Sequence, residues 1–278
     1  MSSKTSVQTE PETFLTLLTQ EVIPRLVLLE QPPAQAAPMS PGSLGVAAMP
    51  TPVDGPLRDQ ADALASLAAA GDLVGCEALV RGEMVQGLRT DAVFLSLIQP
   101  AARLLGERWV KDTSAFTDVT IGLWTLQHVF SQLLDQFHAE ATPGEAGPRL
   151  FLCTVPGAHH RLGLRMVGAF FARAGWSVIS HESGEEPDLL EAAAASGADM
   201  IGLSLATEHD MRLAPALIAR LRQVCRKQQP AIMIGGPAIE VFPAKAAACG
   251  ADLVSGDAPE AVAAAQQFLS RRGHHGSH

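Results

Sequence analysis

From residue 149 onwards, short apolar runs alternate with longer stretches that have the apolar periodicity of helices. The apolar runs cover 150–155, 177–180, 200–204, 231–234 and 253–255, and the helical stretches cover 162–174, 189–195, 211–226, 238–248 and 259–271. Five strand–helix units in succession predict an α/β fold with a doubly wound, parallel five-stranded sheet. Such sheets bind ligands beside the carboxyl ends of their strands, so the residues after each apolar run are the first candidates for a functional site.

Three of these strand ends carry residues that can contact a ligand. The first run leads into Thr154-Val-Pro-Gly-Ala-His-His-Arg-Leu-Gly163, where a neutral imidazole at His160 can ligate a metal ion. The third run ends at Ser204, and the fourth ends at Gly235-Gly236. Each feature also has a plain alternative, a surface-loop histidine or an ordinary strand-to-helix turn. Their common place at one sheet edge favours a binding site.

The spaced set His160-x-x-Gly163, Ser204 and Gly235-Gly236 resembles the cobalamin-binding domain shared by methionine synthase, corrinoid methyl carriers and light-sensing transcription factors. The family's second motif is Ser-x-Leu, here Ser204-Leu-Ala206, and residues 207–234 between it and Gly235-Gly236 agree with the interval of the family pattern. The resemblance spans roughly 149–272 and implies a Rossmann-like domain in which His160 is the lower ligand of the cobalt ion. It also implies a slot for the displaced nucleotide tail of the cofactor. The cofactor-binding residues of this domain are then Gly163, Ser204, Leu205, Thr207, Gly235 and Gly236.

Two positions depart from the family pattern. Ala158 stands where the family has an aspartate, and Ala206 stands where it has a leucine. In the methyl carriers, an Asp–His–Ser relay manages a proton as the cobalt changes oxidation state, because the carboxylate holds the other nitrogen of the ligating ring. An alanine side chain cannot do this. The sequence therefore predicts a chain that holds cobalamin as a sensor, and we expect it not to be an enzyme.

The stretch 57–140 is Ala-rich with few β-branched residues, which favours a small bundle of about four helices. Breaks are expected at 71–72, 87–90 and 111–113, with Asp72 and Thr90-Asp91 as N-caps. The resemblance implies that this bundle caps the upper face of the cofactor, because Gly106-Glu-Arg-Trp109 matches the start of the family's cap signature. Val119-Thr120 replace the Glu-His pair with which that signature ends.

The resemblance implies that Trp109, Phe116 and Val119 contact the upper face of the cofactor. Trp124 and His128, one helical turn apart, are further candidates. Their plain alternatives are a tryptophan in the bundle core and a polar residue on a helix surface.

The first 56 residues are interpreted as a separate N-terminal region. An apolar helix is expected over 14–29, which Pro24 kinks or splits, and a Pro/Ala-rich flexible linker follows. This helix is interpreted either as packed on its own body or as a docking or regulatory helix. A second linker at 142–148 separates the bundle from the sheet domain, which is expected over 149–272.

Composition excludes several classes of function. The net charge of −9 argues against a large basic footprint on nucleic acid, so direct DNA contact is not expected. The four cysteines form no Cys-x-x-Cys pair and are typical of cytosolic thiols. The sequence has no basic start followed by a long apolar stretch, so we expect a cytoplasmic protein with no membrane partner.

The order of loose N-terminus, helical cap and cobalamin domain resembles the AerR/PpaA-type antirepressors of photosynthetic bacteria. This resemblance implies a light-responsive regulator of transcription that binds hydroxo-, aquo- or adenosylcobalamin in a base-off/His-on form. Its expected partner is a repressor protein of the CrtJ/PpsR type, and homo-oligomerisation is left open. Two alternatives remain, a corrinoid carrier subunit of a methyltransferase and a haem-binding sensor on the same scaffold.

Overall fold

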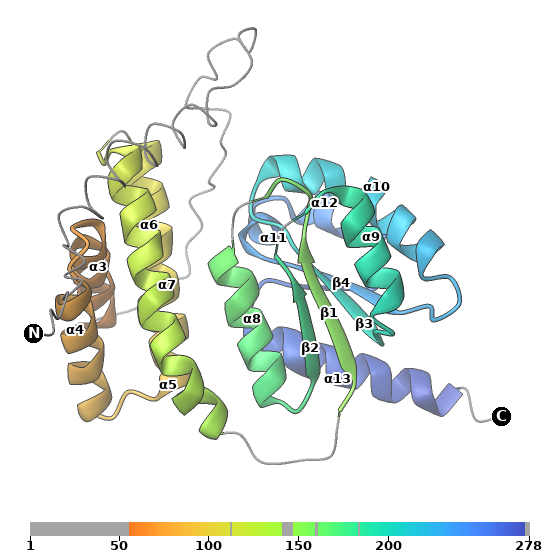
Figure 1. Ribbon diagram of the computed structural model, residues 1–278, viewed down its shortest axis with the longest axis horizontal. Helices are drawn as coiled ribbons and strands as arrows, with labels where there is room; N and C mark the ends of the chain where they lie inside the picture. Colours follow the sequence, from red (N-terminus) through yellow and green to blue (C-terminus); the bar gives the residue numbers. More distant parts are fainter. Residues whose placement is uncertain (1–55, 112, 141–146, 159–160, 183, 276–278) are drawn as a thin grey trace, which may run out of the picture. The chain divides into compact units, whose positions relative to one another are not determined.

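The computed structural model describes residues 56–111, 113–140, 147–158, 161–182 and 184–275 (Figure 1). The helix expected over 14–29 and the linker before Pro56 lie outside the described residues, as does most of the 142–148 linker. The described chain starts with helices and continues with five strands that alternate with helices. The predicted fold class, a helical bundle followed by a Rossmann-like sheet, is therefore confirmed.

The bundle contains α3 (Pro56–Ala69), α4 (Leu73–Val85), α5 (Thr90–Val93), the π-helical turn η3 (Phe94–Ile98), α6 (Gln99–Val110) and α7 (Phe116–Ala139). All three predicted breaks are present. The Asp72 carboxylate accepts a hydrogen bond of 2.9 Å from the Gly75 amide, which confirms the predicted cap of α4. The predicted Thr90 cap is wrong, because Thr90 is already helical and its hydroxyl donates to the Glu140 carboxylate at 2.8 Å.

A wider helical turn joins α5 to α6. Pro100 has no amide hydrogen to donate to the Ser96 carbonyl, so the regular ladder is interrupted there. The Gln99 amide instead donates to the carbonyl of Phe94, five residues back. The Phe94 ring lies in the bundle core, 4.6 Å from the ring of Phe130 between centroids. The proline thus accounts for a feature that periodicity did not predict.

The sheet consists of β1 (Arg149–Thr154), β2 (Ser177–His181), β3 (Met200–Ser204), β4 (Ala231–Gly235) and β5 (Leu253–Ser255). All neighbouring pairs are parallel, and the strand order is β2-β1-β3-β4-β5. From β1, the chain adds β2 on one side of the sheet and then β3, β4 and β5 on the other side. The carboxyl ends of β1 and β3 therefore form the topological switch point, where open α/β sheets bind ligands.

Helices cover both faces of the sheet (Figure 1). One face packs against α9 (Glu186–Ala195), α10 (Glu208–Val224), α11 (Pro237–Val241) and α12 (Pro243–Ala248), and the other packs against α8 (Arg161–Arg173) and α13 (Ala258–His275). Side chains alternate between the two faces, with Phe151 on the α9/α10 face and Leu152 on the α8/α13 face. The single helix predicted over 238–248 is wrong, because Phe242 leaves the helical conformation (φ −123°) just before Pro243.

The bundle packs against the sheet domain through α7 and α8. The Phe137 ring lies edge-on to Phe170 with 5.0 Å between centroids, and the Arg173 guanidinium lies 4.5 Å from the Phe137 centroid. Arg173 also pairs with Asp91 at 3.7 Å and with Glu140 at 3.3 Å. These contacts join the two cores at the end of α7. Within the described ranges, no helix combines the length and the apolar character that a membrane crossing requires.

Candidate functional site

The final residues of four neighbouring strands form one row across the sheet. The strand register pairs Thr154 with Ser204, Ser204 with Gly235, and Gly235 with Ser255. Because side chains alternate along a strand, all four positions belong to the α8/α13 face at the carboxyl edge. The row contains only small residues, and three of them carry hydroxyl groups. It unites the predicted residues Ser204 and Gly235 with Thr154 and Ser255, which sequence reasoning missed.

The hydroxyl of Ser204 is available to a ligand. Ser204 is half-buried, and its side chain has no hydrogen-bond partner within the described part of the chain. By contrast, the Ser255 hydroxyl donates to the Asp257 carbonyl at 3.0 Å. A serine hydroxyl can both donate and accept, so Ser204 offers the row a free polar contact.

The loop after β3 is held in place by backbone hydrogen bonds to β4 and α11. The Leu205 amide donates to the Gly235 carbonyl at 2.8 Å, and the Ala238 amide donates to the Leu205 carbonyl at 3.1 Å. The Leu205 side chain is completely buried in the core under α9 and α10. Leu205 therefore anchors the loop. Its predicted contact with a cofactor stays a prediction, and only the backbone of Leu205 could make that contact.

Thr207 and Asp210 fix the start of α10 by bonding to each other. The Thr207 hydroxyl accepts from the Asp210 amide at 3.1 Å, while the buried Asp210 carboxylate accepts from the amides of Ala206 (2.8 Å) and Thr207 (3.0 Å). This reciprocal arrangement is a capping box. Sequence reasoning missed Asp210, although its position three residues after a threonine at the end of a strand is the signal for such a box. These three bonds stabilise the backbone from Ala206 to Asp210, where the loop after Ser204 enters α10.

The glycine pair at the end of β4 is required by the packing of the chain itself. A Cβ at Gly235 would lie 2.9 Å from the Ser255 carbonyl oxygen, and one at Gly236 would lie 2.5 Å from the Leu205 carbonyl oxygen. Gly236 also has φ +103°, which side chains other than glycine rarely adopt. The alternative of an ordinary strand-to-helix turn is therefore sufficient to explain the pair. Its contact with a nucleotide tail stays a prediction.

The loop after β1 turns sharply before α8. The Ala158 amide donates to the Val155 carbonyl at 3.1 Å, and the Ala158 side chain packs against the core under α9 and α10. The predicted cobalt ligand His160 lies outside the described residues. Gly163 follows in the first turn of α8 and is exposed, and a Cβ built there would meet no heavy atom within 4 Å. The first turn of α8 therefore leaves space into which a ligand can come close to the backbone.

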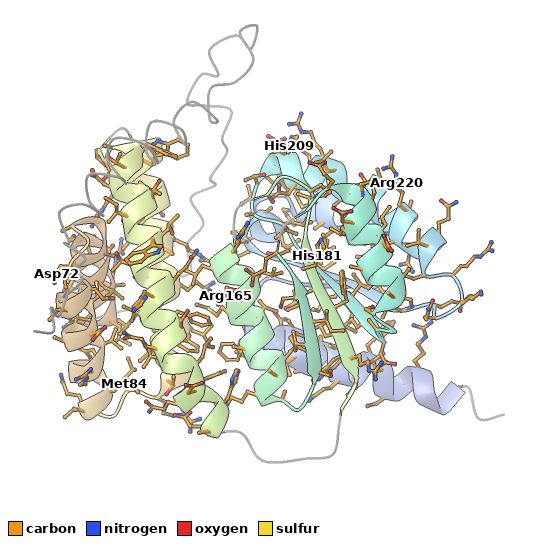
Figure 2. All side chains as sticks on the ribbon, viewed as in Figure 1. Asp72, Met84, Arg165, His181, His209 and Arg220 are labelled. Carbon is orange, nitrogen blue, oxygen red and sulfur yellow. The ribbon has the colours of Figure 1, made fainter. Side chains whose placement is uncertain are left out.

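The end of β2 adds a histidine that sequence reasoning did not single out. His181, labelled in Figure 2, stacks on Phe151 with 6.0 Å between ring centroids. Its Nε2 atom is buried and has no hydrogen-bond partner in the described ranges. Because His181 pairs in register with Cys153, it belongs to the same carboxyl edge, on the far side of β1 from Ser204.

On the helical bundle, the predicted upper-face residues differ in exposure. The rings of Trp109 and Phe116 lie edge to face, 6.3 Å apart between centroids, with Trp109 half-buried and Phe116 exposed. Val119 is only 8% exposed and packs in the bundle core. Its side chain has little surface for a ligand, so its predicted contact with the cofactor stays untested.

One face of α7 exposes aromatic side chains. Trp124 is 62% exposed, so the alternative that placed it in the bundle core is wrong. Its indole stacks on His128 with 5.7 Å between ring centroids, and the exposed Ile121 is a neighbour on the same helix. Thr120, Trp124 and His128 recur every four residues and therefore share one side of α7.

Comparison with known proteins shows similarity to a cobalamin-binding family. Residues 148–266 match the family model of the B12 binding domain. The chain is 28% identical over 160 residues to an uncharacterized 20.5 kDa protein in the bchF-crtJ intergenic region of Rhodobacter capsulatus, a match that covers 58% of this chain and 83% of that protein. It is 32% identical over 120 residues to dimethylamine corrinoid protein 2 of Methanosarcina acetivorans, covering 42% of this chain and 53% of that relative.

A solved structure shares the fold. The monomethylamine corrinoid protein of Methanosarcina barkeri matches with a TM-score of 0.63 at 16% identity, and the match covers 77% of this chain and 100% of that chain. At this identity the match shows that the two chains have a common architecture.

Proposed function

We propose that the protein is a light-responsive cobalamin-binding regulator of transcription that acts by binding a repressor protein. The proposal starts from the match of residues 148–266 to the B12 binding domain. His160 is the lower cobalt ligand in this proposal, and Ser204 and Gly163 contact the cofactor at the sheet edge. A bound alkylcobalamin supplies a cobalt–carbon bond that visible light breaks. The chain itself binds the cofactor and covers it, and its affinity for the repressor changes when the cofactor changes.

The sheet edge fits such a cofactor. The row of small residues from Thr154 to Ser255 lies at the switch point, and the Ser204 hydroxyl is free to bind a polar group. Gly163 leaves space beside the start of α8, where a large planar group can approach the backbone. Together these features support the predicted slot for a nucleotide tail.

The observation that carries a sensor role is the apolar environment of Ala158. Its side chain packs against the core under α9 and α10, where it cannot hold the second nitrogen of a ligating imidazole. A carrier that cycles between cobalt oxidation states needs that proton relay. A sensor that only keeps the cofactor in place does not.

In this proposal, the exposed side of α7 is the part of the protein that responds to the form of the bound cofactor. Trp124 and Phe116 expose apolar surface with which they would cover a bound cofactor, and Thr120 stands where the family has a histidine. Two forms of the cofactor can shift the protein between two arrangements only if they bind those arrangements with different free energies. A tenfold difference in affinity corresponds to about 1.4 kcal/mol.

A protein partner fits better than direct binding to DNA. The net charge of −9 disfavours a basic footprint on phosphates. The similar protein of Rhodobacter capsulatus is encoded in the bchF-crtJ intergenic region, and a CrtJ/PpsR-type repressor is the partner class that the sequence resemblance implies.

The test uses the full-length chain loaded with adenosylcobalamin in the dark and then illuminated. We expect a spectral change on illumination, and an affinity for the repressor that differs between the dark and light samples. Trp124→Ala should reduce that difference, whereas Val254→Ala, an exposed residue on β5, should leave it unchanged. Equal affinity of dark and illuminated protein for the repressor would refute the proposed switch.

A second candidate function is that of a corrinoid carrier for methyl transfer. It is favoured by the 32% identity to dimethylamine corrinoid protein 2. Repeated methyl transfer by the purified chain, together with a corrinoid methyltransferase pair, would establish this role. A failure to turn over, together with tight cobalamin binding, supports the sensor.

A further inference from the structure

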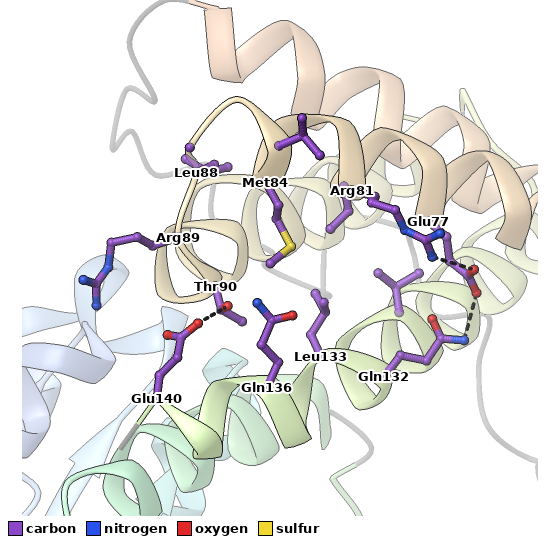
Figure 3. A pocket seen from close by; sticks show the side chains of 14 residues that line it. Glu77, Arg81, Met84, Leu88, Arg89, Thr90, Gln132, Leu133, Gln136 and Glu140 are labelled. Atoms are coloured by element: carbon purple, nitrogen blue, oxygen red, sulfur yellow. Dashed lines mark hydrogen bonds and ion pairs between the residues drawn. The ribbon is translucent and has the colours of Figure 1, made fainter. Parts of the chain in front are cut away.

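A groove of about 560 Å³ lies between α4 and α7 on the helical bundle (Figure 3). Its apolar lining comes from Val80 and Met84 on α4, Leu88 in the following loop, and Val129 and Leu133 on α7. None of the predicted cobalamin-binding residues lines it. The groove is therefore a separate surface, and the inference from it does not depend on the proposed function.

The outer side of α4 lacks a partner within the described part of the chain. Val85 at the edge of the groove is 84% exposed, and Val74 at the other end of the helix is 78% exposed. Between them, Ala78 and Gly82 are also exposed, whereas the inner residues Cys76 and Val80 are buried. Exposed apolar surface of this kind is typical of sites that bind another molecule. Among the described residues, α4 is covered only on the side of the bundle core.

The groove has the dimensions of a short helix. Its α7 wall runs from Val129 to Glu140, and eleven helical rises span about 16 Å. The α4 residues that line the groove are Glu77, Val80, Arg81 and Met84, which recur at intervals of three and four. Both walls therefore present residues at helical spacing. A docked helix of three turns matches this length and would insert apolar residues at positions i, i+4 and i+7.

The charges on the rim favour an acidic occupant. Glu77 already accepts from Gln132 at 2.8 Å, and Glu140 already accepts from Thr90 and pairs with Arg173. Arg81 pairs with Glu77 at 3.9 Å and Arg89 pairs with Asp91 at 3.2 Å, but the side chains of the two arginines are 77% and 67% exposed. Such exposed ion pairs are weak, so a partner's carboxylates can replace them. In a chain of net charge −9, this groove therefore offers two exposed guanidinium groups. Such groups favour carboxylates on a partner and disfavour a basic one.

We propose that the α4/α7 groove binds an amphipathic helix of a partner protein in which apolar anchor residues are flanked by carboxylates. The apolar residues of that helix lie against Val80, Met84 and Leu133, and its carboxylates meet Arg81 and Arg89. The matching exposure of Val85 and Val74 on the same helix provides a control, because only Val85 lines the groove.

The probe is a synthetic, fluorescein-labelled helical peptide of about three turns, with leucines at i, i+4 and i+7 and glutamates at both ends. Its binding to the full-length chain is measured by fluorescence anisotropy. We expect saturable binding that the double variant Arg81→Glu/Arg89→Glu weakens by about tenfold or more. Val85→Asp should weaken binding to a similar extent, because it places a charge beside the apolar lining.

Control variants and a control peptide distinguish binding in the groove from nonspecific binding. Val74→Asp and Arg226→Glu, an exposed arginine on the sheet domain, should change affinity by less than about twofold, because neither residue lines the groove. A peptide with lysines in place of the glutamates should bind about tenfold more weakly or not at all. Absence of saturable binding, equal binding of the lysine peptide, or equal losses in Val74→Asp and Val85→Asp would overturn the proposal. So would dimerisation of the chain that Val85→Asp abolishes, because a second copy would then cover the groove.

Discussion

Gly163→Ala adds one methyl group in the first turn of α8. A Cβ at this position meets no heavy atom within 4 Å, so the substitution creates no clash within the described chain. Alanine is favoured over glycine in helices by about 0.5–1 kcal/mol, because glycine loses more backbone freedom on folding. We therefore expect the free energy of unfolding to rise by up to about 1 kcal/mol, measured by urea denaturation followed by circular dichroism.

The same methyl group should weaken cofactor binding. If cobalamin comes close to the backbone at Gly163, the added carbon occupies space that the ligand needs. We expect hydroxocobalamin affinity to fall by about tenfold or more, equivalent to about 1.4 kcal/mol, in a spectroscopic titration. Gly82→Ala in α4 is the matched control, because its added Cβ also meets nothing within 4 Å, and it should raise stability without affecting affinity. Unchanged affinity in Gly163→Ala would refute the placement of the ligand at the start of α8.

Three further predictions concern stability. Gly236→Ala should lower the free energy of unfolding by about 1–3 kcal/mol because of its φ of +103°, and a wild-type urea midpoint would contradict this. Asp210→Ala removes two hydrogen bonds from backbone amides and should cost about 1–3 kcal/mol, with Asp210→Asn retaining part of the stability in the same assay. Burial raises the pKa of Cys153 to about 12 and that of Cys76 to about 11. In the unfolded chain, these thiols ionise at a lower pH, near about 8.5, than in the folded protein. The stability that they contribute below about pH 8.5 should therefore be lost as the pH rises towards 11. Urea midpoints that rise from pH 8 to pH 10.5 would contradict this.

Strands and helices of the sheet domain were predictable because their signals are local. The apolar run over 200–204 coincides with β3, and that over 150–155 differs from β1 by one residue at each end. Each run is bounded by polar or turn-forming residues, and burial on both faces makes such runs continuously apolar. The cap of α4 at Asp72 was predictable for the same reason, since capping depends only on residues within one turn.

Features that depend on distant neighbours were not predictable. The row from Thr154 to Ser255 arises from the register of four strands, which no local pattern specifies. The sequence also could not distinguish a ligand slot at Gly236 from close contact with Leu205, because both require the absence of a Cβ. The exposure of Trp124 depends on which side of α7 faces the bundle core, and an isolated tryptophan does not reveal that.

The role of His160 is tested most directly by the absorption spectrum of the purified full-length chain loaded with hydroxocobalamin. The wild-type spectrum should be that of the base-off/His-on form, and His160→Ala should lose both this spectrum and tight binding. A base-on spectrum, or a spectrum and affinity that His160→Ala leaves unchanged, would contradict cobalt ligation by this histidine.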